Sequence, residues 1–160
     1  MTGNVVNENI GVIECNIADF NGDGRDDYMT WQPGGWYVAL STGSQFAPPM
    51  LWLDTYMYGP NGALLGRTTN APHQHVADFD GDGLYDFLFN FLGWHVALSN
   101  GERFEVPRLW LANDAVPGVD THFDGREFVA DFTGDGQVDY LWNFLGWNLA
   151  STLVTPAQYL

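Results

Sequence analysis

Basic residues and cysteine are scarce in this sequence. Only 5 of the 160 residues are Lys or Arg, while 20 are Asp or Glu, and the formal net charge is −15. A nucleic-acid-binding surface needs a basic footprint, and an anionic membrane surface attracts basic segments, so the charge argues against both partners. Cys15 is the single cysteine, which rules out a disulfide within the chain.

Long apolar runs and helical patterns are missing as well. No apolar stretch approaches the roughly 18 residues that a membrane-spanning helix needs, so no membrane insertion is predicted. Residues 1–4 lack the basic and apolar regions of a signal peptide, but a mature chain would look the same, so the compartment is left open. The length of 160 residues and a hydrophobic share of 46% suit one domain, taken as residues 1–160.

Acidic residues are abundant, and more than half of them gather in three short segments. Residues 19–28, 78–87 and 131–140 hold 11 of the 20 acids. Each segment begins with Asp-Phe, has Gly at its fourth and sixth positions, and has Asp at its fifth and ninth positions. Plain Asp/Gly turns need no acid at every repeated position, so the recurrence favours a metal site over simple turns.

The spacing within the first segment suits a Ca²⁺-binding loop. Oxygen-bearing side chains alternate along it, and Ca²⁺ takes about six to eight oxygen ligands, which a curled loop supplies by pointing alternate side chains inward. Gly24 permits the sharp turn that a Cβ would obstruct. The predicted ligands of this loop are Asp19, Asn21, Asp23, the backbone carbonyl of Arg25, and Asp27.

The repeat extends beyond the loops and predicts short strands. A brief apolar stretch precedes each loop, and three runs rich in aromatic and β-branched residues follow it, separated by Gly, Asp and Ser turns. A four-stranded antiparallel sheet that recurs at about 50 residues is typical of a propeller blade. The sequence therefore predicts an all-β fold of three four-stranded antiparallel β-propeller blades, in repeats 1–53, 54–111 and 112–160. A dockerin-like arrangement would need closer loops followed by amphipathic helices, and neither is present.

The loop pattern Ala-Asp-Phe-Asx-Gly-Asp-Gly-x-x-Asp resembles the FG-GAP/VCBS repeats of integrin α-subunit-like β-propellers. Residues 36–43 and 94–101 are also similar to the later strands of those repeats. The resemblance implies a Ca²⁺ loop between the first two strands of each blade. It also favours an extracellular protein, since such repeats occur in cell adhesion, in secreted bacterial proteins and in propeller lectins.

The resemblance extends the set of Ca²⁺ ligands to the other two loops. Thr133 departs from the Asp or Asn that is usual at the third position, and an uncharged hydroxyl is a weaker ligand, so the third site is expected to be the weakest. The implied ligands are Asp78, Asp80, Asp82, the backbone of Leu84 and Asp86 in the second loop, and Asp131, Thr133, Asp135, the backbone of Gln137 and Asp139 in the third.

Ring closure bears on the partners of the chain. Propellers close with about four to eight blades, and the predicted repeats supply three. The chain is then either part of a longer propeller or one half of a ring that a second copy completes. We expect a homodimer with six blades, because open blade faces rich in Trp and Phe are rarely tolerated on a soluble monomer.

Two adjacent positions in each repeat suggest different roles. A Trp recurs at positions 36, 94 and 147, which predicts packing between blades. The residue after it varies and should lie on the opposite face of its strand. Varied aromatic and polar residues on a fixed scaffold suit sugar recognition, although ordinary blade-edge packing explains them equally well. The candidate ligand-binding residues are Tyr37, His95 and Asn148 at this position, and Trp31 at a further varied position that holds Asn90 and Asn143 in the other repeats.

No arrangement of Ser, His and Asp or of Cys and His for nucleophilic catalysis can be located, and the acids are better explained as Ca²⁺ ligands. We therefore predict a protein that is not an enzyme and that binds a glycan or glycoprotein, as a Ca²⁺-stabilised propeller lectin. The alternative is a Ca²⁺-stabilised propeller module for protein–protein adhesion or scaffolding.

Overall fold

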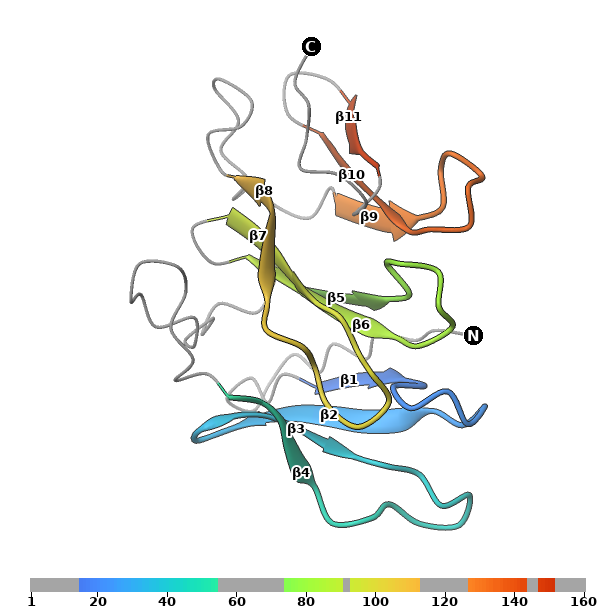
Figure 1. Ribbon diagram of the computed structural model, residues 1–160, viewed down its shortest axis with the longest axis vertical. Helices are drawn as coiled ribbons and strands as arrows, with labels where there is room; N and C mark the ends of the chain where they lie inside the picture. The colour runs from blue at the N-terminus through green and yellow to red at the C-terminus, as the bar shows by residue number, and fades with distance from the viewer. Residues whose placement is uncertain (1–14, 55–73, 91–92, 113–126, 144–146, 152–160) are drawn as a thin grey trace.

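The computed structural model describes residues 15–54, 74–90, 93–112, 127–143 and 147–151. Every regular element in these residues is a β-strand, and the strands form three antiparallel sheets, so the all-β prediction is confirmed. Within this described part of the chain, no helix is long and apolar enough to cross a membrane. Figure 1 shows the three sheets stacked in chain order, in the manner of successive propeller blades.

Each of the first two sheets is a four-stranded meander. Strands that are neighbours in the sequence pair with each other, in the orders β1-β2-β3-β4 and β5-β6-β7-β8. The first blade consists of β1 (Cys15–Ala18), β2 (Asp27–Gln32), β3 (Gly35–Ala39) and β4 (Met50–Asp54). The second consists of β5 (Gln74–Ala77), β6 (Asp86–Asn90), β7 (Gly93–Ala97) and β8 (Arg108–Ala112).

The third sheet has three strands in the described residues, in the order β11-β10-β9. They are β9 (Glu127–Ala130), β10 (Asp139–Asn143) and β11 (Trp147–Ala150). The fourth predicted run of this repeat, residues 156–160, lies outside the described residues. The order and direction of the three strands are those of a blade, as in the first two sheets.

The third strand of a blade carries the recurring Trp. β3 and β7 start at Gly35 and Gly93 and include the Trp that follows. Gly35 leaves no room for a side chain, since a Cβ there would lie 2.1 Å from the backbone oxygen of Leu53 in β4. The register with the fourth strand shifts directly after the Trp in both blades, so the same β-bulge bends both outer edges.

The blades pack on each other through aromatic side chains. Trp36 of β3 contacts Phe87 of β6 with ring centroids 4.8 Å apart, and Trp94 of β7 contacts Tyr140 of β10 at 4.6 Å. All four rings are buried, and full burial of such a side chain stabilises the fold by roughly 1.5–3 kcal/mol. The prediction that the recurring Trp packs between blades is confirmed at these two junctions. The side chain of Trp147 lies outside the described part of the structure.

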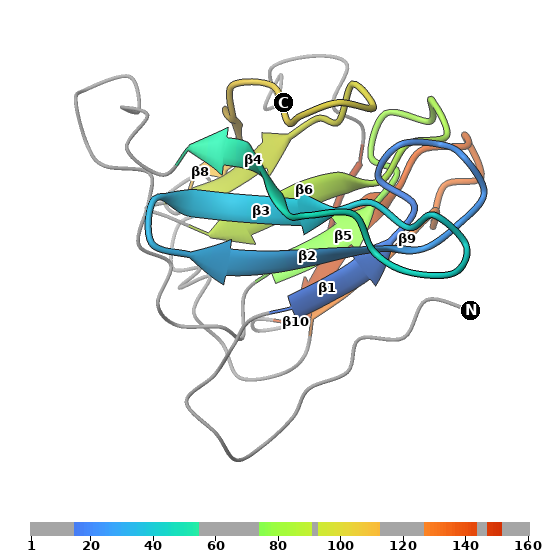
Figure 2. The same cartoon turned by 90° about the horizontal axis from the view of Figure 1, so that it is seen from below.

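The three acidic loops lie along one edge of the stack of blades. Each joins the first two strands of its blade, and in Figures 1 and 2 all three project from the same side. Neighbouring loops touch, because a Cβ on Gly22 would lie 2.7 Å from Cδ2 of Leu84, and one on Gly81 would lie 3.1 Å from the backbone oxygen of Gly136. The glycine at the fourth loop position therefore makes room for the next loop.

Candidate functional site

The first Asp of each acidic loop holds the backbone of that loop. In the second loop, the N–H groups of Gly81 and Asp82 donate to Oδ1 of Asp78 at 2.7 and 3.1 Å, and the N–H of Gly83 donates to Oδ2 at 2.9 Å. The first and third loops repeat these three bonds on their own first Asp. Gly83 has a φ of 92°, which a residue with a Cβ rarely adopts, so the predicted role of the sixth-position glycine is confirmed.

The fifth-position carboxylate accepts a hydrogen bond from the seventh residue of the same loop. These N–H···O bonds join Arg25 to Asp23 at 3.0 Å, Leu84 to Asp82 at 2.8 Å, and Gln137 to Asp135 at 3.0 Å. The predicted backbone ligand at the seventh position thus belongs to a residue whose N–H group is already anchored. Hydrogen bonds within the protein therefore join the fifth and seventh positions of each loop.

The ninth-position Asp begins the second strand of each blade and is buried. Asp86 accepts hydrogen bonds from the N–H groups of Phe79 at 2.8 Å and Ser99 at 2.7 Å. Burial raises the pKa of Asp86 to about 7, although the two backbone donors act in the opposite direction. Asp27 accepts the equivalent pair of bonds in the first blade, and burial raises its pKa too. This residue joins the loop to the end of the third strand of its own blade.

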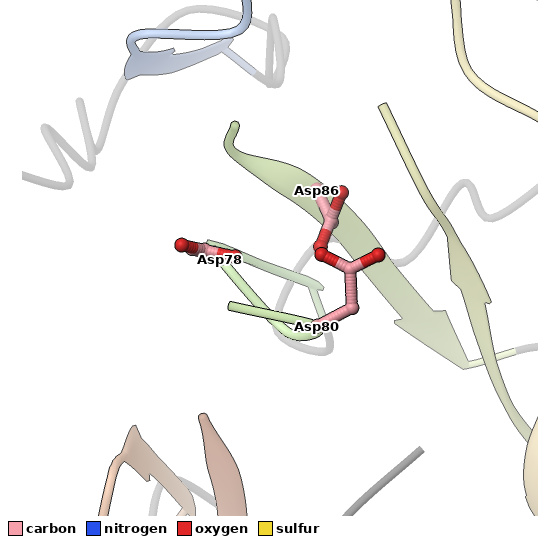
Figure 3. A group of neighbouring side chains, drawn as sticks. All are labelled: Asp78, Asp80 and Asp86. Carbon is pink, nitrogen blue, oxygen red and sulfur yellow. The ribbon is translucent and has the colours of Figure 1, made fainter. Parts of the chain in front are cut away.

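Three carboxylates converge in the second loop. One oxygen from each of Asp78, Asp80 and Asp86 lies within 4.8 Å of the others, and no other such trio of acidic, His or Cys side chains occurs in the described residues. Figure 3 shows the carboxyl groups of Asp80 and Asp86 facing each other, with Asp78 beside them. Burial, and then the charge of Asp82, raise the pKa of Asp80. Crowded oxygen donors of like charge fit a divalent cation such as Ca²⁺, whose charge would relieve their repulsion.

The first loop has the same backbone bonds but a different arrangement of charge. Its third residue is Asn21, and the Nδ2 of this side chain donates to Oδ2 of Asp23 at 3.2 Å. Nη2 of Arg25 contacts the same oxygen at 2.5 Å. The guanidinium of Arg25 therefore forms an ion pair with the carboxylate of Asp23, which the sequence analysis predicted as a Ca²⁺ ligand.

The third loop combines an exposed first Asp with a buried ninth Asp. The backbone N–H of Gly136, followed by those of its neighbours, holds the pKa of Asp131 below its usual value. Oδ2 of Asp139 accepts bonds from the N–H groups of Phe132 and Thr133 at 2.8 and 3.0 Å. Oδ1 of Asp139 is buried and has no hydrogen-bond partner within the described residues. A buried carboxylate oxygen left unpaired is costly, and a bound cation would satisfy it.

The candidate sugar-binding residues differ in their exposure. His95 is 6% exposed, its ring stacks on Phe89, and burial lowers its pKa. Trp31 and Tyr37 are partly exposed, and Trp31 packs against the core between the first two blades. The side chain of Asn148 is not among those described. Their role stays a prediction, and it is least favourable for His95, which offers little surface to a ligand.

A groove that no sequence pattern indicated lies between the first two blades. It has a volume of about 560 Å³ and runs between β4 and the connection from β7 to β8. The rings of Trp52 and Phe104, 5.4 Å apart, line its buried side. Asn100, Arg103 and Glu105 line its exposed side. The recurrence of Trp at positions 52 and 110 was the available signal, but it does not say which segments meet.

The chain is similar to a protein of known structure and to a known repeat family. A solved structure of a lectin from Agrocybe aegerita, described as recognising non-reducing terminal N-acetylglucosamine, is 31% identical to this chain and superposes with a TM-score of 0.63. The match covers 82% of this chain and 32% of that one, so this chain spans about a third of the lectin's length. No curated protein matches the chain. Residues 19–89 match the model of the FG-GAP-like repeat, the repeat that the loop motif resembles.

Proposed function

We propose that the protein is a non-catalytic, Ca²⁺-binding propeller lectin. The observation that carries this proposal is the likeness, at 31% identity and a TM-score of 0.63, to a lectin described as recognising terminal N-acetylglucosamine. N-acetylglucosamine, or a glycan that ends in a related sugar, is accordingly the proposed ligand. The groove between the first two blades is the proposed binding site.

The second loop is the strongest candidate for the Ca²⁺ site. Its support is the approach of three carboxylate oxygens, from Asp78, Asp80 and Asp86, to within 4.8 Å of one another. A bound ion would supply positive charge at this point and would offset the repulsion between the carboxylates. Within the chain itself, Asp78 holds the loop backbone, and Asp86 joins the loop to Ser99, two residues after the end of β7.

The ordering of the second loop bears directly on the groove. The N–H of Tyr85 in this loop donates to the backbone oxygen of Asp19 at 3.1 Å, so the second loop supports the first. The hydroxyl of Ser99 donates to the backbone oxygen of Phe20 at 2.7 Å, and Asp86 binds the N–H of the same Ser99. Beyond Ser99, the same connection carries Phe104 into the groove. Ca²⁺ bound to this loop would therefore stiffen the sugar site.

The chemistry of the groove suits a sugar. Pyranose rings present C–H faces that pack on apolar side chains, and their hydroxyls bond to amide, carboxylate and guanidinium groups. Leu51 and Val106, which are 45% and 59% exposed, supply the apolar surface over the buried rings of Trp52 and Phe104, while Asn100, Arg103 and Glu105 supply polar groups. Arg103 forms no ion pair within the described residues, and its guanidinium is therefore available to a ligand.

A glycan array probed with the full chain in Ca²⁺, and again after EDTA treatment, tests the proposal. We expect binding to glycans with terminal N-acetylglucosamine and weaker binding in EDTA. Calorimetry with N-acetylglucosamine would then compare Arg103→Ala with Gln45→Ala, the equivalent position on the first blade, which does not line the groove. Arg103→Ala should weaken binding about tenfold, which corresponds to about 1.4 kcal/mol, while Gln45→Ala should leave it unchanged.

Three outcomes would change the proposal. An array without any bound glycan in Ca²⁺ would favour a module for protein–protein adhesion. Loss of binding in Tyr37→Ala but not in Arg103→Ala would move the site to the residues that the sequence indicated. Turnover of chromogenic N-acetylglucosaminides that persists after repurification would contradict the absence of catalysis.

A further inference from the structure

The second blade binds two successive peptide groups at the start of the first acidic loop. The N–H of Tyr85, in the second loop, donates to the backbone oxygen of Asp19 at 3.1 Å. The hydroxyl of Ser99, two residues after the end of β7, donates to the backbone oxygen of Phe20 at 2.7 Å. Ser99 and Phe20 are both buried, so water does not compete for the second bond. The start of the first loop is therefore held by hydrogen bonds from another blade.

These bonds connect the ninth-position carboxylates of the two loops. The peptide group whose oxygen binds Tyr85 also carries the N–H of Phe20, which donates to Oδ2 of Asp27 at 3.2 Å. In the second blade, the N–H of Ser99 donates to Oδ1 of Asp86 at 2.7 Å. Asp86 of the second loop is therefore joined to Asp27 of the first through Ser99 and Phe20, without a break in the hydrogen bonds.

The connection is specific to this pair of loops. Ser41 is the equivalent of Ser99 in the first blade, and its N–H likewise donates to the ninth-position Asp, at 2.7 Å. Its hydroxyl accepts a bond from the N–H of Gly43 at 3.3 Å, as that of Ser99 does from Gly101 at 3.1 Å. Within the described residues, however, the hydroxyl of Ser41 bonds to no other blade, and no backbone hydrogen bond joins the second and third loops. Ser41 is therefore a matched control for Ser99.

The two loops differ in how strongly they attract a cation. The second brings three carboxylates within 4.8 Å of one another, whereas in the first the carboxylate of Asp23 pairs with the guanidinium of Arg25. The second loop should therefore bind the first ion. A cation there removes the repulsion between its carboxylates and so keeps Asp86 on the N–H of Ser99. Because the first ion has already ordered these shared groups, a second ion loses less conformational entropy when it binds, which is positive cooperativity.

We propose that the first two acidic loops bind Ca²⁺ cooperatively, the second before the first, and that Ser99 is the positioning residue that couples them. This inference rests on the Ca²⁺ binding proposed above. An ion in the second loop fixes Ser99, the hydroxyl of Ser99 holds the carbonyl of Phe20, and the N–H of Phe20 keeps Asp27 in place for the next ion. Because the two binding free energies are linked, an ion in the first loop strengthens binding to the second by the same factor.

Two-dimensional amide NMR of the chelator-treated full chain, titrated with Ca²⁺, follows the two loops separately. The reporters are the N–H groups of Gly24 and Gly83, each bonded to the first Asp of its own loop. In the unchanged chain, the signal of Gly83 should shift at a lower Ca²⁺ concentration than that of Gly24. Asp80→Asn combined with Asp82→Asn removes two charges from the second loop and leaves amide oxygens to accept its N–H bonds. This double variant should lower the Ca²⁺ affinity of the first loop about fivefold.

Ser99→Ala separates the hydrogen bonds from the effect of charge. It removes the bond to Phe20 but keeps the N–H that binds Asp86, and it changes no charge. In this background, the double variant of the second loop should alter the affinity of the first by less than about twofold. In Ser41→Ala, the dependence of about fivefold should persist. An equal dependence with and without the Ser99 hydroxyl would show coupling by charge alone and would overturn the proposal.

The reciprocal measurement keeps the proposal testable if Ser99→Ala fails to fold. Asp23→Asn weakens the first loop, and it should then lower the affinity reported by Gly83 in the second by a similar factor, about fivefold. Loops that bind Ca²⁺ with independent affinities would overturn this inference alone. If Ca²⁺ shifts neither Gly24 nor Gly83, the proposed Ca²⁺ binding is overturned together with it.

Discussion

The first and second acidic loops share one backbone and differ in their charges. In both, the first Asp accepts three N–H groups and the ninth Asp accepts two; the bond from Phe20 to Asp27, at 3.2 Å, is longer than its equivalent from Phe79 to Asp86, at 2.8 Å. Only in the second do three carboxylates come within 4.8 Å of one another. The first has Asn21 in place of Asp80, and Arg25 in place of Leu84.

This difference indicates that the backbone conformation of the loop and its affinity for a cation depend on different residues. The backbone bonds need one carboxylate at each end of the loop and glycine at the turns, and both loops satisfy that need. The convergence of negative charge depends on the third and seventh positions, which leave the backbone unchanged. A loop of this family can therefore keep its conformation while its affinity for Ca²⁺ varies.

The largest effect is expected from removal of the ninth-position charge. In EDTA, Asp86→Asn and Asp27→Asn should each lower the free energy of unfolding by about 1–3 kcal/mol, because an amide accepts only one of two buried N–H bonds well. The added stability in Ca²⁺ should fall further in Asp86→Asn than in Asp27→Asn. Urea unfolding with and without Ca²⁺ measures both the free energy of unfolding in EDTA and the stability that Ca²⁺ adds. An equal Ca²⁺-dependent loss in the two variants would contradict the difference between the loops.

Exchange of the third residue between the first two loops should reduce or reverse the difference in their Ca²⁺ affinities. Asp80→Asn should weaken Ca²⁺ binding to the second loop about tenfold, and Asn21→Asp should strengthen binding to the first by a similar factor, or about 1.4 kcal/mol. Calorimetric titration of the chelator-treated protein measures the change. Asn100→Asp adds the same charge outside the loops and serves as the control. If it strengthens binding as much as Asn21→Asp does, net charge and not loop position is responsible.

The third loop offers a smaller version of the same test. Thr133→Asp introduces a third-position carboxylate beside Asp139, whose Oδ1 is buried without a described partner. We expect a gain in Ca²⁺ affinity of about fivefold, because the substitution adds a charged ligand. The gain should be smaller than in the first loop, because Asp131, the first Asp of the third loop, is exposed to water. Luminescence of bound Tb³⁺, excited through nearby aromatic rings, follows this site. Thr133→Asn is the matched uncharged variant, and an equal gain from it would exclude the role of charge.

The smallest effect is expected at the seventh position. Arg25→Leu releases Asp23 from its ion pair and should strengthen Ca²⁺ binding to the first loop about two- to threefold, since exposed pairs contribute about 1 kcal/mol or less. Leu84→Arg should weaken the second loop by a similar factor. Because a surface pair is screened by salt, both effects should shrink between low and high ionic strength. Effects that are independent of salt would point to changed packing between the loops.

The sequence by itself determined the blades and the form of their loops. Alternating strand patterns, the glycine positions and the Asp at each end of a loop are local features, because the groups that they engage lie within about ten residues or on the next strand. The strand predicted directly after each loop is present as β2, β6 and β10, and the recurring Trp was placed correctly between blades at Trp36 and Trp94.

Only the tertiary structure decided what these parts meet. The groove joins β4 to a connection of the next blade, the burial of His95 depends on the blade beside it, and the pairing of Asp23 with Arg25 depends on the direction of two side chains. Phe46 is likewise exposed while Phe104, at the equivalent position of the second blade, is buried, and the repeat pattern does not distinguish the two. Burial is a property of neighbours that are distant in the chain, so a repeated motif predicts a contact surface without saying whether it is covered.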